Sequence, residues 1–127
     1  MFHFTALVTC LSIALYFFTA TRVAKARSAF GIRPPAISGD PEFERVFRVQ
    51  MNTLEWMPIF LPLLWLSAVY FNDAASAAVG LAWIVGRALY YVGYCEAVEK
   101  RRPGFFIQAM ACLLLLIGAV AGVVMHW

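Results

Sequence analysis

Two sets of polar residues repeat at helical spacing beside apolar segments of this chain. In the first, successive members lie three, four and three positions apart, a spacing that places them on one helix face. The second set would also fall close to one line if its helix continues far enough. The sets are Arg45, Arg48, Asn52 and Glu55, and Arg87, Tyr90, Tyr94 and Arg101. Cations, an amide, a carboxylate and phenols would then meet at one depth.

Such a pocket would suit a zwitterionic ligand. Guanidinium groups bind carboxylates in a fork geometry, and Glu55 could hold an ammonium group. A structural alternative exists, because arginines at membrane ends often extend to lipid headgroups and tyrosines form interfacial belts. In that alternative, Glu55 only pairs with Arg87 to hold a bundle together. The convergence of both sets favours a binding site, since ionisable groups at membrane depth are costly and usually face a bundle interior or a watered cavity.

The composition indicates an integral membrane protein with a single all-α domain over residues 1–127. The chain is 63% hydrophobic and 13% charged, whereas soluble domains are roughly a quarter charged, and its mean hydropathy is +0.77. Most basic residues lie beside apolar segments, so the net charge of +3 indicates orientation in a bilayer and not nucleic-acid binding. Cys10, Cys95 and Cys112 are interpreted as small buried residues, and no metal site is expected.

Four segments are long and apolar enough to cross a membrane, which needs about 20 residues each. They are Phe2–Thr21, Leu54–Phe71, Ala74–Cys95 and Phe105–Trp127. The connections after the first and third segments carry most of the basic residues. We therefore expect a four-transmembrane-helix bundle with both of these connections in the cytoplasm and both termini on the non-cytoplasmic side.

The second helix is expected to start well before its apolar part. Asp40 followed by Pro41 is typical of a helix N-terminus, so the helix would run from Pro41 to Phe71. That length is about 46 Å at 1.5 Å per residue, which exceeds a hydrocarbon core of about 30 Å. Its first turns should project from the membrane, and the preceding segment Ser28–Gly39 is predicted to be a loop.

The motif "ERVFRVQMNTLEWMPIFLPLLW" resembles a pattern of the MAPEG family, the membrane-associated proteins in eicosanoid and glutathione metabolism. That pattern is Glu-Arg-Val-x-Arg-x-Gln-x-Asn-x-x-Glu-Tyr-x-Pro. The flanking stretches "PPAISGDPEFERVFR" and "GRALYYVGY" match as well. The likeness covers about residues 27 to 104 by motif and the whole chain by its arrangement of spans.

The resemblance implies a homotrimer of MAPEG-like four-helix protomers that binds glutathione as co-substrate near the cytoplasmic face, between neighbouring subunits. Arg101 matches the arginine that glutathione-conjugating members use to stabilise the thiolate, and is the expected catalytic residue. The expected glutathione-binding residues are Arg27, Arg48, Gln50, Asn52, Glu55, Trp56, Tyr90 and Tyr94. Arg102 is interpreted as an orientation charge.

Two positions depart from the family pattern. Trp56 stands where the family usually has tyrosine and lacks the phenolic oxygen. Ser28 follows Arg27 where leukotriene-forming members carry a second arginine, which weakens the case for a leukotriene substrate.

The expected function is conjugation of glutathione to lipophilic electrophiles that arrive from the bilayer, and the same chemistry would suit reduction of lipid hydroperoxides. The alternative is a non-catalytic lipid- or ligand-binding scaffold of the same fold. A scaffold would not need a cation at the thiol, so Arg101 distinguishes the two. The small size and the absence of a C-terminal retention signal favour a bacterial inner membrane over the endoplasmic reticulum.

Overall fold

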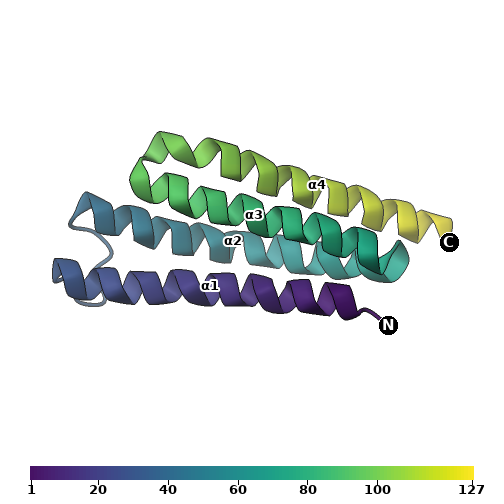
Figure 1. Cartoon of the computed structure of the whole chain (residues 1–127), viewed down its shortest axis with the longest axis horizontal. Helices are drawn as coiled ribbons and strands as arrows, with labels where there is room; N and C mark the ends of the chain where they lie inside the picture. Colours follow the sequence, from purple (N-terminus) through teal and green to yellow (C-terminus); the bar gives the residue numbers. More distant parts are fainter.

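The computed structural model describes all residues 1–127, and it consists of four long helices that lie side by side as an antiparallel bundle (Figure 1). The helices are α1 (His3–Phe30), α2 (Pro41–Tyr70), α3 (Asp73–Glu96) and α4 (Arg102–Met125). A short 3₁₀ helix, η1 (Val98–Arg101), joins α3 to α4. The predicted all-helical four-helix bundle is confirmed.

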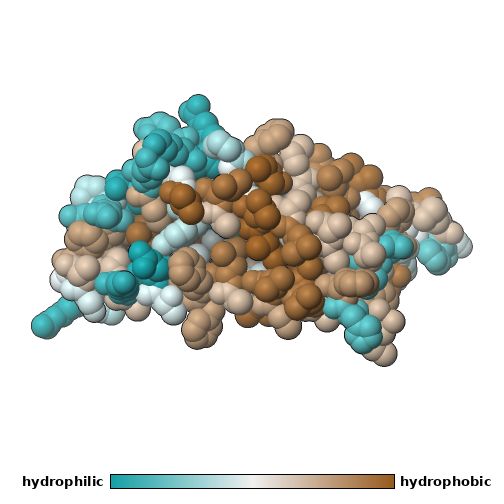
Figure 2. Space-filling view, viewed as in Figure 1, coloured by the Kyte–Doolittle hydropathy of each residue, from teal (hydrophilic) through white to brown (hydrophobic).

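All four helices are long and apolar enough to cross a membrane, so the protein is an integral, multi-pass membrane protein. Both termini lie at one end of the bundle, and the α1–α2 loop and η1 lie at the other (Figure 1). We call this second end the basic end, because the loop, η1 and the adjoining helix ends carry most of the basic residues. Figure 2 shows hydrophilic residues concentrated at that end and an apolar band across the middle. The side of the membrane that the basic end faces stays a prediction.

The boundaries of the second helix follow its capping residues. Asp40 is the N-cap, and its Oδ1 accepts a hydrogen bond of 2.8 Å from the backbone N–H of Glu42. The predicted start at Pro41 is confirmed, and α2 ends at Tyr70, one residue earlier than expected. Asn72 then caps α3 by accepting from the backbone N–H of Ala75 at 2.8 Å. The link between α2 and α3 is therefore a tight turn.

The first helix extends further than predicted. The expected span ended at Thr21 and the expected loop began at Ser28, but α1 continues to Phe30. No proline or glycine interrupts the sequence before Gly31, and alanine, lysine and arginine in this stretch are good helix formers. Gly31 adopts the left-handed conformation, with φ of 65°, and ends the helix. The loop therefore begins at Gly31.

The third helix does not continue to Arg101, so the condition under which Arg101 would share a line with Arg87, Tyr90 and Tyr94 is not met. Ala97 is extended, with φ of −160° and ψ of 144°, and it ends α3 at Glu96. The chain then forms η1, and Pro103 lies in the first turn of α4, where its fixed φ favours a new helix. Arg101 therefore lies on a turn between two helices, and α4 begins at Arg102 instead of Phe105.

The bundle core is aromatic at its centre. The rings of Phe60 and Trp83 stack with centroids 3.8 Å apart and planes 5° from parallel. Leu64 and Leu115 are buried beside them in the same cluster. This contact joins α2 to α3 and fixes the depth of the polar residues that lie nearer the basic end.

Backbone-to-backbone contact brings α3 and α4 together near the basic end. A Cβ atom on Gly104 would lie 2.2 Å from the backbone nitrogen of Tyr90 and 2.5 Å from the carbonyl oxygen of Gly86. A Cβ on Gly86 would in turn lie 2.7 Å from the backbone nitrogen of Gln108. Only glycine fits at these two positions, so they set the spacing between α3, which carries Tyr90, and α4, which follows the turn that carries Arg101.

We predict that Gly104→Ala destabilises the protein by about 1–3 kcal/mol, the usual cost of overpacking, because backbone atoms cannot move aside as a side chain can. The measurement is the thermal unfolding midpoint of the protein in detergent. Gly118→Ala on the same helix is the matched comparison and should lower the midpoint by less, since its nearest neighbour, at 2.9 Å, is the side-chain oxygen of Ser67 and not a backbone atom. That oxygen can move at the cost of its hydrogen bond to Ser76. Equal midpoints for Gly104→Ala and wild type would contradict this account of the helix contact.

Candidate functional site

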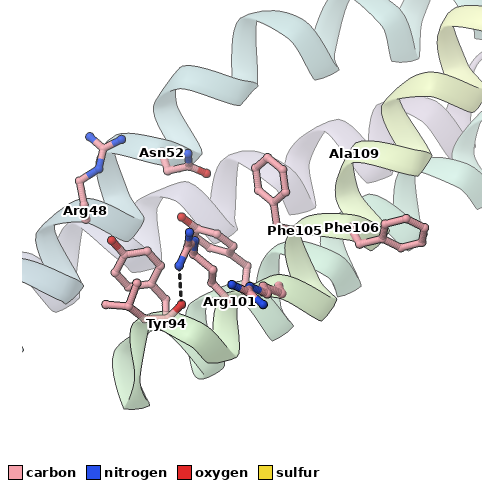
Figure 3. Close-up of a pocket in the computed structure, with 10 residues that line it drawn as sticks. Arg48, Asn52, Tyr94, Arg101, Phe105, Phe106 and Ala109 are labelled. Atoms are coloured by element: carbon pink, nitrogen blue, oxygen red, sulfur yellow. Dashed lines mark hydrogen bonds between the residues drawn. The ribbon is translucent and has the colours of Figure 1, made fainter.

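A cavity of about 610 Å³ opens at the basic end between α2, α3, η1 and the start of α4. Its lining combines charged, phenolic and apolar side chains (Figure 3). The lining residues are Arg48, Asn52, Tyr90, Tyr94, Val98, Arg101, Arg102, Phe105, Phe106 and Ala109. The structure thus brings five members of the two predicted polar sets together, although the helix carrying the second set ends before Arg101. The other three members, Arg45, Glu55 and Arg87, do not line the cavity.

Positive charge dominates the mouth of this cavity. Arg48, Arg101 and Arg102 line it, and Glu55 is the acidic side chain bonded to this group. Glu55 Oε1 lies 3.3 Å from Arg48 Nη2, and the two side chains are 56% and 50% exposed. A pair this exposed contributes little to stability, about 0–1 kcal/mol. Arg48 can therefore exchange this partner for a ligand carboxylate at small cost.

Arg101 is held in place by the turn on which it lies. Its Nη1 donates to the backbone carbonyl of Val98 at 2.8 Å, the dashed line in Figure 3. This hydrogen bond uses one of five guanidinium donors. The remaining donors are available to a group bound in the cavity.

Aromatic rings form the wall of the cavity on the α3–α4 side. The Tyr90 and Tyr94 ring centroids are 5.4 Å apart, and the Tyr90 and Phe105 centroids are 6.2 Å apart. Trp56 does not line the cavity but packs edge-on against Phe105, at 5.6 Å between centroids. Beyond this wall, Phe106 is 64% exposed on the surface of the bundle. The polar cavity therefore adjoins an apolar surface at membrane depth.

Arg87 lies beneath the cavity. The structural alternative expected it to pair with Glu55, but it does not. Its Nη1 donates to Asn52 Oδ1 and its Nη2 donates to Thr53 Oγ1, both at 2.7 Å. Only 1% of the residue is exposed. The polar group of α2 and that of α3 are therefore joined through an amide and a hydroxyl, without a carboxylate.

Arg27 lies outside the cavity of this protomer. Its Nη1 donates to the backbone carbonyl of Ala36 at 2.7 Å, and its guanidinium lies 5.2 Å from the centre of the Phe43 ring. Gln50 and Glu55 are on α2 but do not line the cavity either. The roles expected of these residues and of Trp56 stay predictions, as do those of the residues that line the cavity.

Four apolar residues and one cation of the lining were not expected from the sequence. The helix break brings the apolar residues together, because it turns the start of α4 toward α3. They are Val98, Phe105, Phe106 and Ala109. Arg102 was interpreted as an orientation charge, yet it also lines the cavity. The sequence signal that could have located them is Pro103, which is typical of a new helix start.

Comparison with known proteins identifies the family of this chain. The family model "MAPEG family" matches residues 5–121. Human microsomal glutathione S-transferase 2 is 45% identical over 116 residues, which are 91% of this chain and 79% of that protein. An uncharacterized protein of Synechocystis is 43% identical over 118 residues, 93% of this chain and 86% of that protein.

Leukotriene C4 synthase of Bos taurus is 36% identical over 122 residues, which are 96% of this chain and 81% of that protein. The match to the family model extends through all four helices and spans the part of the chain that forms the cavity. The chain is a member of the MAPEG family, related to microsomal glutathione S-transferase 2 and leukotriene C4 synthase.

Proposed function

We propose that this protein is a membrane glutathione transferase that joins glutathione to lipophilic electrophiles. The observation that carries the proposal is the cavity at the basic end, which three arginines and two tyrosines line together with apolar side chains. The human relative is a microsomal glutathione S-transferase, which supports the same chemistry. We further propose that the basic end faces the cytoplasm, where the positive-inside bias would place it.

The cavity suits glutathione in size and charge. Its volume of about 610 Å³ lies within the roughly 300–1,000 Å³ that small-molecule sites occupy. Glutathione carries two carboxylates, one ammonium group and one thiol. Arg48 and Arg102 can bind carboxylates, and Glu55 beside Arg48 can bind the ammonium group. The excess of arginines over carboxylates favours a ligand with net negative charge.

Arg101 is proposed to stabilise the thiolate. A free cysteine thiol has a pKa of about 8.5, and the thiolate is the nucleophile, so a guanidinium at the sulfur increases the reactive fraction at neutral pH. The thiol proton passes to water. The sulfur then forms a bond to the electrophilic carbon while the electrons of the breaking bond move to the leaving group or, for an epoxide, to the ring oxygen.

The apolar side of the cavity is proposed to admit the second substrate. Phe105, Phe106 and Ala109 line the cavity on α4, and the exposed side of Phe106 would face lipid. A lipophilic electrophile dissolved in the bilayer could therefore reach the sulfur without crossing water. Reduction of lipid hydroperoxides by the same thiolate would use the same approach. A scaffold without catalysis would not require the cation at position 101.

We also propose that the functional unit is a homotrimer. The expected ligands Arg27 and Gln50 lie outside the cavity of their own protomer. Leu54 and Ile59 of α2 are each 45% exposed, which leaves an apolar face for a neighbour. A second protomer packed on this face could contribute Arg27 and Gln50 to a site that one protomer leaves incomplete.

Arg48 is the residue that tests the proposed carboxylate contacts. Arg48→Ala should weaken glutathione binding by about 1.5–3 kcal/mol, the range for hydrogen bonds to charged groups. Calorimetric titration of the purified protein in detergent measures the dissociation constant. Lys25→Ala, which removes an exposed charge of α1 outside the cavity, should bind as wild type does. Unchanged affinity in Arg48→Ala would remove Arg48 from the site.

The second prediction concerns the assembly. Mass measurement in detergent should give three copies of the chain, and glutathione binding should require that assembly. A variant that removes the apolar face, Leu54→Glu with Ile59→Glu, should yield monomers that bind glutathione weakly or not at all. Monomers that bind glutathione with wild-type affinity would overturn both the trimer and the shared site.

The third prediction separates an enzyme from a scaffold. Arg101→Ala should leave glutathione affinity nearly unchanged but lower turnover by about ten- to a hundredfold, because a charge-assisted interaction of about 1.5–3 kcal/mol is lost at the sulfur. The ultraviolet thiolate signal of the complex should fall in parallel. Raising the pH should restore part of the rate, since the thiol then ionises without help.

Two further variants complete this test. Arg101→Lys should be intermediate, because it keeps the charge but loses the planar fork. Lys100→Ala is the matched control, since Lys100 pairs with Glu96 and does not line the cavity. A wild-type rate in Arg101→Ala at neutral pH would make Arg101 an orientation charge, with Tyr94 the next residue to test.

A further inference from the structure

Arg87 is a buried cation for which the protomer supplies no carboxylate. Its exposed fraction is 1%, and it lies on α3 inside the bundle. The salt bridges in the structure are Arg48–Glu55 and Lys100–Glu96, so Arg87 belongs to neither. Burying an unpaired charge costs several kcal/mol or more. Its surroundings should therefore show what this charge contributes.

The hydrogen bonds around Arg87 have a fixed direction. Arg87 can only donate, and it donates to Asn52 Oδ1 and Thr53 Oγ1. The Thr53 hydroxyl hydrogen is itself used, because Thr53 Oγ1 donates to the backbone carbonyl of Val49 at 2.7 Å. Thr53 therefore presents a lone pair to Arg87, and two consecutive residues of α2 hold the guanidinium.

This arrangement determines which end of the Asn52 amide faces outward. Because Arg87 requires an acceptor, Oδ1 is turned inward and Nδ2 must point away from Arg87. Asn52 Nδ2 lies 3.5 Å from Glu55 Oε1, a long contact, and Asn52 lines the cavity. The Asn52 oxygen is thus engaged by Arg87, and the N–H groups of Nδ2 are the part of this lining side chain that remains for Glu55 or for a ligand.

The same guanidinium also supports an aromatic wall. Arg87 Cζ lies 4.3 Å from the centre of the Tyr90 ring, within the range of a cation–π contact. Tyr90 lines the cavity, and only 4% of it is exposed. One buried cation therefore contacts two cavity residues from behind and reaches the cavity only through them.

We infer that Arg87 is a positioning residue for glutathione, which acts through Asn52 and Tyr90 without touching the ligand. It orients the amide so that the cavity presents a donor to a carboxylate or thiolate, and its uncompensated charge favours an anionic ligand. This inference rests on the proposed function. It goes beyond the ligand contacts proposed above, because it adds a residue behind the cavity that determines specificity for an acceptor.

The test compares variants of Arg87 with a control of equal burial. Arg87→Met removes the charge and the donors, and Arg87→Lys keeps the charge but loses the fork. Gln108→Met is the control, because Gln108 is fully buried and accepts from Trp83 Nε1 at 3.1 Å, yet it does not line the cavity. Each protein is measured in detergent for its thermal midpoint, its glutathione dissociation constant and its KM for a generic aromatic electrophile.

We expect glutathione to bind about ten- to a hundredfold more weakly to Arg87→Met, the loss for a charged hydrogen-bond partner, and by a smaller factor to Arg87→Lys. The KM for the electrophile should stay within about twofold of wild type, as uniform loss of function is not expected of a positioning residue. Gln108→Met should lower the thermal midpoint but leave glutathione affinity within about twofold. Asn52→Ala combined with Arg87→Lys should weaken binding by less than the product of the single effects.

Two results would overturn the inference. If Arg87→Lys binds glutathione as wild type does, or weakens it only as much as Gln108→Met, Arg87 merely ties α2 to α3. The comparison uses Arg87→Lys as well as Arg87→Met, so a methionine variant that fails to fold leaves the test intact. A wild-type protein that binds no glutathione would overturn the proposed function itself, and this inference with it.

Discussion

The absence of water in the bilayer core is the constraint on which the rest of this structure depends. A polar group at membrane depth must find its partner within the protein or face a cavity. At the end of the bundle opposite the basic end, the polar groups satisfy one another. Ser67 and Ser76 share a hydrogen bond of 2.6 Å, and Trp65 Nε1 donates to Thr9 Oγ1 at 2.9 Å. These pairs join helices and leave nothing over for a ligand.

The basic end follows the opposite pattern. Arg48 and Glu55 form a pair that is about half exposed, Arg101 uses one donor on a backbone carbonyl, and Arg87 has no acid partner. The polar groups at the first end therefore join helices to one another, whereas those at the basic end keep donors for the proposed ligand. An end with unused donors and excess positive charge is stable in the membrane only if it faces water or an anionic ligand, and the cavity provides that space.

Much of this arrangement could be predicted from the sequence. The cap at Asp40, the start of α2 and the face shared by Arg48 and Asn52 depend on local spacing, which the sequence displays directly. The third span was predicted to end at Cys95, one residue before α3 ends, but the way η1 and α4 lie against α3 could not be predicted in the same way. Ala97 is extended because η1 and α4 fold back onto α3, and that contact requires Gly86 and Gly104, which are distant in sequence and whose pairing is visible only in three dimensions.

The partner of Arg87 could not be predicted for a related reason. The sequence suggested a pair between Arg87 and Glu55, because their charges are opposite. The helix contact set by Phe60 and Trp83 places Arg87 against Asn52 and Thr53 instead. A carboxylate at that point would have neutralised the cation. The Asn52 amide accepts the hydrogen bond from Arg87 without neutralising the guanidinium. The region beneath the cavity therefore keeps its net positive charge. The choice of Asn52 over an acidic residue is thus the step that turns a costly buried arginine into a determinant of what the cavity can bind.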